Sequence, residues 1–148
     1  MVTDLTERSL VEAGTPAPVL VVELSSGENF DIEAHRGEVV VLNFWATWCP
    51  PCRAEAPTLT RIHNRLSGSG GTVVGISADR MPLPTVAEHA LGLGMEYPIG
   101  RTEEEAFHRF HVTELPTTYV VSRDGQITWS HVGAVSEEQL WEAIEGVL

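Results

Sequence analysis

The sequence predicts an α/β domain whose central mixed β-sheet is flanked by helices, with an N-terminal β-hairpin and a helical insertion in the middle. Two apolar, β-branched runs, residues 39–45 and 72–78, are typical of strands buried on both faces. A helical pattern separates them, so they form a βαβ unit with parallel strands. Two later strands are joined by a tight turn and pair antiparallel, so the sheet is mixed.

Length and composition favour one domain over residues 1–148. The chain has 148 residues, 43% of them hydrophobic and 20% charged, which suits a globular domain with its own core. The net charge of −12 repels phosphate backbones, so we expect no nucleic-acid partner. Residues 1–15 lack the cationic start and apolar centre of a secretory signal, and we expect a poorly structured or helical extension there.

The first predicted elements form a hairpin. Residues 19–24 and 28–32 are predicted strands, and the sequence between them is Ser25-Ser-Gly27, a turn. The buried strand at residues 39–45 follows.

The longest predicted helix covers residues 50–66. Its apolar positions recur at spacings of three and four, at Leu59, Ile62 and Leu66. Pro57 interrupts the pattern and predicts a kink, because proline cannot donate the helical hydrogen bond. A stretch rich in glycine and serine ends the helix.

The helical insertion follows the second buried strand. Residues 84–93 form one candidate helix, and residues 102–110 form a second, shorter one. The second helix begins with Thr102 followed three residues later by Glu105, which is the pattern of a capping box.

The chain closes with a hairpin and a helix. Residues 117–122 and 126–132 are predicted strands, joined by a turn at Arg123-Asp-Gly125. The last helix covers residues 136–148, and Ser136 opens it with a second capping box.

The only two cysteines, Cys49 and Cys52, follow the first buried strand, where sites in such sheets are usually built. Structural zinc needs four ligands, and His108 and His111 are too close together for a finger, so we expect no metal. A structural staple is a poor interpretation, because the loop that the disulfide closes is very short.

A redox centre accounts for the neighbouring residues as well. Cys49 falls at a strand-to-helix junction, where helix amides and the helix dipole stabilise a thiolate. Pro50 and Pro51 suit the first helical positions, since both lack an N–H group and have fixed φ. Cys52 lies one turn further along and is placed to resolve a mixed disulfide formed at Cys49. This chemistry requires no metal and no organic cofactor.

The surrounding segment resembles the thioredoxin superfamily, through Asn43-Phe-Trp-Ala-Thr-Trp-Cys-Pro-Pro-Cys-Arg-Ala-Glu-Ala-Pro57. Trp48 before the first cysteine, the CxxC motif and Pro57 five residues after the second cysteine all match. The resemblance extends over about residues 15–148, and it implies the thioredoxin fold. Within the superfamily, the chain is most similar to the TlpA/ResA-type membrane-associated or periplasmic thiol-disulfide reductases, which are AhpC/TSA-related thioredoxin-like domains.

The resemblance implies an acid–base role for Glu55, three residues after Cys52 and on the same helix face. A carboxylate there takes up or returns a proton as Cys52 attacks or leaves. The alternative is a solvated charge in the first helical turn. Asn43 stands where small thioredoxins carry a buried aspartate, which shifts the acid–base role toward Glu55.

The resemblance also implies substrate-binding residues. Pro116 matches the cis-proline of the fold, which keeps the site compact and excludes metals, and the main chain of Leu115 pairs with an extended substrate segment. From the residues alone, Leu115 and Pro116 indicate only the start of a strand. Trp48 is expected to offer partner proteins an apolar contact surface.

Three other functions stay open. A peroxidase of this fold carries threonine three residues before the reactive cysteine, but Ala46 stands there and Thr47 is one position too late. Cytochrome c maturation reductases carry a proline-glutamate-threonine tripeptide at the cis-proline, whereas Pro116 is followed by Thr117. A binding module without redox activity would keep its function in a Cys49→Ser variant.

The sequence thus predicts a thiol-disulfide oxidoreductase, most simply a monomeric reductase of disulfide-bearing proteins. Reduced Cys49 attacks the partner disulfide, and Cys52, assisted by Glu55, resolves the mixed disulfide. An upstream thiol donor, such as a membrane electron conduit, regenerates the dithiol. The resemblance places the protein outside the cytoplasm, its export signal lying outside this chain, and a cytoplasmic location is the alternative. The residues leave the direction of electron transfer open.

Overall fold

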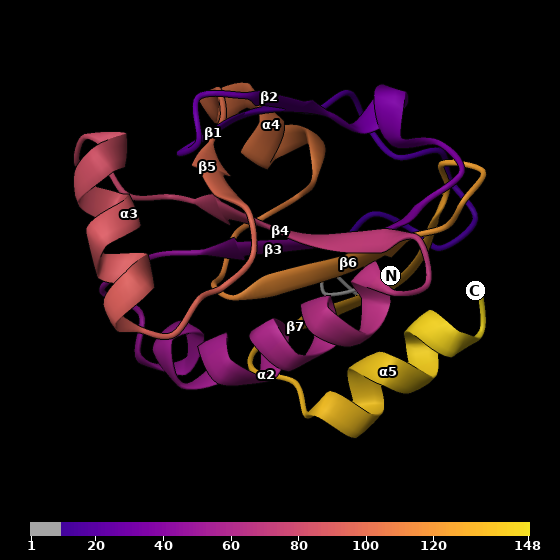
Figure 1. The fold of residues 1–148 in the computed structure, drawn as a ribbon. Helices are drawn as coiled ribbons and strands as arrows, with labels where there is room; N and C mark the ends of the chain where they lie inside the picture. The colour runs from indigo at the N-terminus through magenta and orange to yellow at the C-terminus, as the bar shows by residue number, and fades with distance from the viewer. Residues whose placement is uncertain (1–9) are drawn as a thin grey trace, which may run out of the picture.

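The computed structural model describes residues 10–148, which form one seven-stranded sheet with helices on both faces (Figure 1). The strands are β1 (Val21–Leu24), β2 (Asn29–Asp31), β3 (Val39–Trp45), β4 (Gly71–Ser77), β5 (Ile99–Arg101), β6 (Thr117–Val121) and β7 (Ile127–Val132). The helices are the short 3₁₀ helix η1 (Ile32–His35) and the α-helices α2 (Pro50–Ser67), α3 (Leu83–Gly92), α4 (Glu104–Arg109) and α5 (Glu137–Glu145).

The sheet has the strand order β2-β1-β5-β4-β3-β6-β7. The pairs β3–β4 and β4–β5 are parallel, and every other neighbouring pair is antiparallel. The helices α2 and α5 lie side by side against one face, while α4 lies against the other (Figure 1). The predicted α/β class, with a mixed sheet, an N-terminal hairpin and a helical insertion, is confirmed.

The core consists of two hydrophobic layers that meet at β3. On the α2 side, Val39, Val41 and Trp45 pack with residues of α2, α3 and α5. On the opposite side, Leu42 and Phe44 pack against α4 and the N-terminal hairpin. Because β3 is buried on both faces, its sequence is apolar nearly throughout. The one polar side chain in this strand, at position 43, belongs to the candidate site.

The structure adds β5, which the sequence did not predict. β5 is three residues long and contains Gly100, so it carries almost no strand pattern. The glycine is required because a Cβ at this position would collide with the carbonyl oxygen of Glu23 in β1. β5 thereby joins the N-terminal hairpin to the parallel part of the sheet.

The two predicted capping boxes differ in outcome. Ser136 caps α5, since its Oγ accepts a hydrogen bond of 3.1 Å from the backbone N–H of Gln139. The box at Thr102 is wrong: α4 begins at Glu104, and the Thr102 hydroxyl donates instead to the carbonyl of Val21 in β1, at 2.7 Å. A cross-strand acceptor within reach has replaced the helix amides as partner of this hydroxyl.

Two other predictions concern chain ends and proline. Pro57 lies inside α2, which is continuous through it, and the kink stays a prediction. Of the predicted N-terminal extension, residues 1–9 lie outside the described residues. Further along it, Gly14 donates to the carbonyl of Ile127 at 2.7 Å, which pairs this stretch with β7.

None of the helices within residues 10–148 combines the length and apolar character that crossing a membrane requires.

Candidate active site

Cys49 is the N-cap residue of α2, four residues after the last residue of β3, Trp45. Its sulfur accepts a hydrogen bond from the backbone N–H of Cys52, with an N–S distance of 3.3 Å. Pro50 and Pro51 occupy the first two helical positions and offer no N–H group, so the amide of Cys52 is the first that reaches the sulfur. The predicted placement of this cysteine at a helix N-terminus is confirmed.

Cys49 and Cys52 form a disulfide, with their Cα atoms 5.3 Å apart. Both are buried, with exposed fractions of 4% and 2%. The structure is therefore that of the oxidised protein. The reduced form would present the Cys49 sulfur to the same helix amide, which stabilises a thiolate.

Glu55 is buried beneath the cysteine pair, with 3% of its surface exposed. Its Oε1 accepts a hydrogen bond of 3.1 Å from Asn43 Nδ2, and its Oε2 accepts one of 2.9 Å from the backbone N–H of Val135. Burial raises the pKa of Glu55 from 4.5 to about 7, although both hydrogen bonds favour the charged form and oppose this rise. The interpretation of Glu55 as a solvated helix charge is therefore wrong.

Asn43 connects Glu55 to the sheet. Its side chain is 1% exposed, and Nδ2 also donates to the Thr118 hydroxyl at 3.1 Å. Asn43 lies at the centre of the sheet, opposite Thr118 of β6 and Gly75 of β4. Asn43 is thus a neutral amide in a buried position, where the small thioredoxins carry a buried aspartate.

The peptide bond between Leu115 and Pro116 is cis. The carbonyl oxygen of Leu115 lies 3.7 Å from Cys49 Sγ, so the loop before β6 runs directly beside the disulfide. A groove of about 520 Å³ passes between this loop and the start of α2. Its wall is mostly apolar, formed by Trp48, Cys49, Pro50, Pro51, Ala78, Phe107, Val112, Thr113, Glu114 and Leu115.

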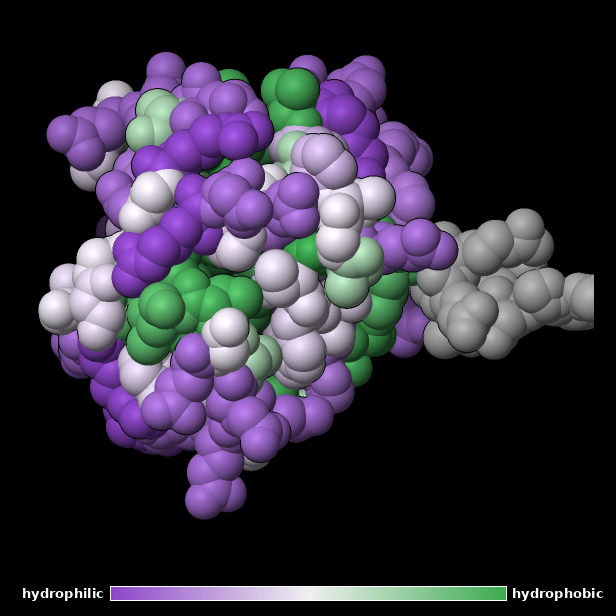
Figure 2. All heavy atoms as spheres, turned by 90° about the vertical axis from the view of Figure 1, so that its right-hand side faces the viewer, coloured by the Kyte–Doolittle hydropathy of each residue, from purple (hydrophilic) through white to green (hydrophobic). Residues whose placement is uncertain are grey.

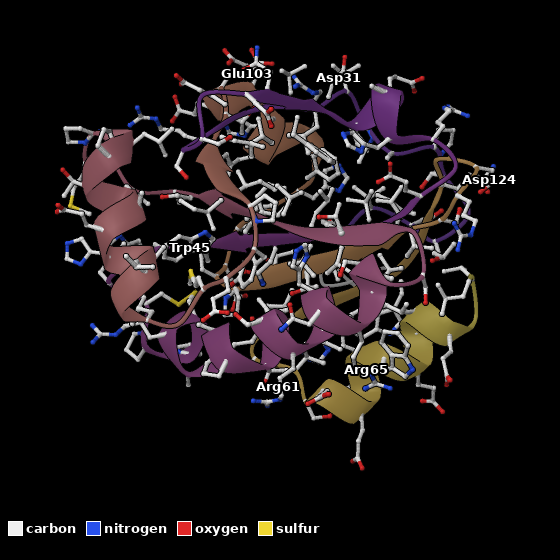
Figure 3. All side chains as sticks on the ribbon, viewed as in Figure 1. Asp31, Trp45, Arg61, Arg65, Glu103 and Asp124 are labelled. Carbon is white, nitrogen blue, oxygen red and sulfur yellow. A yellow bond between two sulfur atoms is a disulfide. The ribbon has the colours of Figure 1, made fainter. Side chains whose placement is uncertain are left out.

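Trp48 is exposed to 66%, an unusual fraction for an indole side chain, and it forms one edge of this groove. Trp45, three residues earlier, is fully buried at the same end of the sheet (Figure 3). The opposite end of the molecule is largely hydrophilic, with only small hydrophobic patches (Figure 2). An exposed tryptophan beside the reactive sulfur fits the predicted contact surface for partner proteins.

Asp79, which is not among the residues predicted from the sequence, holds the loop between β3 and α2. Its carboxylate accepts hydrogen bonds from the N–H and hydroxyl of Thr47, at 3.0 and 2.6 Å, and from the Ser77 hydroxyl at 2.7 Å. A signal for this contact was present, because Asp79 lies two residues after the end of β4, and parallel neighbours end at the same edge of a sheet.

Within residues 10–148, the structure brings no three histidine, cysteine or acidic side chains together as a metal site would require. The last site residue, Pro57, lies one turn after Arg53 on α2 and is exposed to solvent. The residues that the structure brings together around the disulfide are therefore Glu55, Asn43, Trp48, Leu115 and Pro116.

The chain was compared with known proteins. The model of the AhpC/TSA family matches residues 13–130. The thiol-disulfide oxidoreductase ResA of Halalkalibacterium halodurans is 30% identical over 140 residues, which cover 94% of this chain and 79% of that protein.

Solved structures agree with this match. A thiol:disulfide interchange protein of the thioredoxin family from Chlorobium tepidum has a TM-score of 0.80 at 28% identity, covering 93% of this chain and 97% of that one. StoA from Bacillus subtilis has a TM-score of 0.73 at 23% identity, with 86% and 97% covered, which supports the fold.

Proposed function

The chain belongs to the AhpC/TSA family and is a thiol-disulfide oxidoreductase with the thioredoxin fold, and from this premise we propose that it reduces disulfides in partner proteins outside the cytoplasm. The observation that carries the proposal is the buried Glu55, one helical turn after Cys52, with a pKa of about 7. Near neutral pH such a carboxyl both accepts and returns a proton, as an acid–base catalyst must.

The reaction begins with the reduced enzyme. The Cys49 thiolate, stabilised by the amide of Cys52, attacks one sulfur of the partner disulfide. A bond forms between Cys49 and that sulfur, and the partner's other sulfur leaves as a thiolate that takes up a proton from water.

Resolution of the mixed disulfide follows. The Cys52 thiol gives its proton to Glu55, and the resulting thiolate attacks the Cys49 sulfur. The partner's first sulfur leaves and is protonated. In total, two electrons and two protons pass from the enzyme dithiol to the partner disulfide, and the enzyme ends in the oxidised form that the structure describes. No metal or organic cofactor takes part, and Pro116 is assigned the role of keeping metals from the reduced pair.

Partner binding is assigned to the groove beside the disulfide. Its cis-peptide loop presents the Leu115 carbonyl next to Cys49, which suits a partner segment bound in extended form. The exposed Trp48 supplies apolar contact area at the edge of the groove. The resemblance to TlpA/ResA-type reductases supports an extracytoplasmic location and an upstream thiol donor in the membrane, and we propose that the protein acts as a monomer.

A peroxidase is the second candidate, and one contact argues against it. Thr47 lies two residues before Cys49, and its hydroxyl donates a hydrogen bond to the carboxylate of Asp79. This hydroxyl is therefore not free to bind a peroxide at the Cys49 sulfur. A stopped-flow assay with hydrogen peroxide tests this: we expect oxidation of the reduced protein no faster than that of a simple thiol. Since Pro116 is followed by Thr117, the proposal does not extend to cytochrome c maturation.

The equilibrium reduction potential of the Cys49–Cys52 pair tests the proposed direction. The protein is equilibrated in a graded series of dithiothreitol buffers, and the fraction of free thiol is measured. A potential near that of thioredoxin, about −270 mV, or lower supports a reductase. A potential near that of DsbA, about −120 mV, would identify an oxidant and overturn the proposal.

A further inference from the structure

A row of polar and small residues crosses the sheet directly beneath Glu55. Thr118 of β6, Asn43 of β3 and Gly75 of β4 are neighbours in register, and all three face α2. The first two are already linked through the hydrogen bonds of the Asn43 amide. Gly75, the third, has no side chain, and the side chains of Trp45, Tyr97 and Ile99 occupy the space above it.

Two buried polar groups border Gly75. The indole N–H of Trp45 and the hydroxyl of Tyr97 are buried and have no hydrogen-bond partner among the described residues. Trp45 is 0% exposed and Tyr97 is 6% exposed. A Cβ placed on Gly75 would lie 3.0 Å from Trp45 Nε1 and 3.2 Å from Tyr97 Cε1. The glycine therefore leaves room for both groups at one point of the core.

Leaving two such groups without partners is unfavourable, because each has given up its hydrogen bonds to water on burial, so a common partner is expected. Glu55 lies beside this point, because its Oε1 accepts the 3.1 Å hydrogen bond from Asn43, the register neighbour of Gly75. In agreement, burial raises the pKa of Tyr97, and the negative charge of Glu55 raises it further.

The hydrogen bonds of Glu55 show what is missing. Asn43 and Val135 both donate to it, and such donors serve the ionised carboxylate. A protonated Glu55 has an O–H group of its own, which needs an acceptor. The Trp45 indole only donates, whereas the Tyr97 hydroxyl donates or accepts.

We propose that Trp45 Nε1, the Tyr97 hydroxyl and Glu55 bind one internal water above Gly75, and that this water exchanges hydrogen bonds with Glu55 as its protonation changes. An internal water requires two to four polar partners, and the three groups satisfy this. The proposal rests on the acid–base role of Glu55 and makes Tyr97 a positioning residue for it.

The water has two arrangements. With Glu55 ionised, Trp45 and Tyr97 both donate to the water, and the water donates one hydrogen to the carboxylate. With Glu55 protonated, the carboxyl O–H donates to the water, and the Tyr97 hydroxyl turns to accept from it. Trp45 donates in both arrangements, so Tyr97 is the group whose hydrogen bond reverses, and the two arrangements differ by the one proton that Glu55 carries.

The other titratable groups around this site are few. Cys49 and Cys52 lie at the start of α2, and in the oxidised protein they do not titrate. His63 lies further along α2, its ring centroid 6.4 Å from that of Tyr97. Burial lowers its pKa, and its Nδ1 accepts a hydrogen bond from Val73, so it is neutral at pH 7.

The test is a titration of Glu55 by ¹³C NMR of its side-chain carboxyl in the oxidised protein. In Tyr97→Phe the ionised carboxylate loses a water oriented by two donors, so its titration midpoint is expected to rise by about half a pH unit or more. In Gly75→Ala the added methyl group fills the proposed site, and we expect a rise there too.

Tyr119→Phe is the matched control. The Tyr119 hydroxyl lies in the opposite hydrophobic layer, where it donates to the Phe110 carbonyl and accepts from the N–H of Val11, and its removal should leave the midpoint unchanged. An unchanged or lowered midpoint in Tyr97→Phe would overturn the proposal, and Gly75→Ala decides if that variant does not fold. Because the titration uses no partner and no turnover, its result is independent of whether the protein proves to be a reductase.

Discussion

The side-chain amide of Asn43 donates a 3.1 Å hydrogen bond to Glu55, and this contact joins strand β3 to the helix that carries the cysteines. Both residues are buried. Because an amide does not ionise, Glu55 is the one acid of this pair. Its affinity for a proton is set by burial, which favours the neutral form, against two donated hydrogen bonds, which favour the charged form.

Replacing this acid should slow the second half of the reaction. In Glu55→Gln no group accepts the Cys52 proton, so we expect resolution of the mixed disulfide to slow by a factor on the order of 10² at pH 7. Quenched-flow measurement of partner release checks this. Glu138→Gln, an exposed change on α5, is the control. Equal rates in wild type and Glu55→Gln would remove Glu55 from the mechanism.

The raised pKa of Glu55 also predicts how stability depends on pH. Between pH 4.5 and about 7 the carboxyl is protonated in the folded protein but ionised in the unfolded chain, so the folded state binds more protons. The contribution of Glu55 to stability is therefore greatest below pH 4.5 and is lost as pH rises through 7. Relative to Glu55→Gln, the free energy of unfolding of the oxidised protein should fall by about 3 kcal/mol over this range.

Urea unfolding of both proteins at a series of pH values measures this difference. The oxidised form is used because its cysteines do not titrate. A difference that stays constant with pH would mean that Glu55 has an ordinary pKa.

The two cysteines should behave differently when replaced singly. Cys52→Ser keeps the attacking sulfur and lacks the resolving one, so it should accumulate a mixed disulfide through Cys49 with any partner that it reduces. Cys49→Ser should accumulate none, because the remaining thiol is the more buried of the two, at 2% exposed. Non-reducing electrophoresis with mass spectrometry of the adducts distinguishes the two. Trapping by Cys49→Ser alone would reverse the assigned roles.

Trp48 should matter for binding and hardly for stability. Because 66% of the Trp48 surface is exposed, Trp48→Ala is expected to change the free energy of unfolding by less than about 0.5 kcal/mol. The rate at which this variant reduces a protein disulfide should fall about fivefold, which corresponds to about 1 kcal/mol of lost contact energy. The rate with a small disulfide should stay the same. Leu91→Ala, exposed to 75% on α3, is the control and should alter neither rate. A loss with both substrates would indicate that Trp48 acts on the disulfide itself.

The elements that the sequence predicted well are those with a long and uniform pattern. β3 has the predicted bounds, because burial on both faces favours an apolar residue at every position of the strand except position 43. α2 extends only one residue beyond its prediction. β5 escaped prediction, since Gly100 was selected for close approach to β1, which leaves no local pattern. The predicted second strand ran one residue too far, because Asp31 caps η1 with its side chain.

The candidate site divides in the same way. Cys49, Cys52 and Glu55 lie within one local segment, and helical spacing alone relates them. The place of Asp79 at the site could have been predicted from the sequence, because it follows a neighbouring parallel strand. The hydrogen bond from Val135 to Glu55 could not have been predicted, because any residue has a backbone N–H and its position depends on how the chain enters α5. The pairing of Trp45 with Tyr97 likewise depends on tertiary packing around Gly75.

The two donors that hold Glu55 come from β3 and from the loop before α5, at positions 43 and 135 of the chain. An eight-residue peptide or a foreign loop carrying Trp48 to Glu55 would thus transplant the thiols without the environment that raises the pKa of Glu55. Anyone grafting this redox centre into another scaffold must move three separate segments together. The dithiol motif is portable, and its proton chemistry belongs to the whole domain.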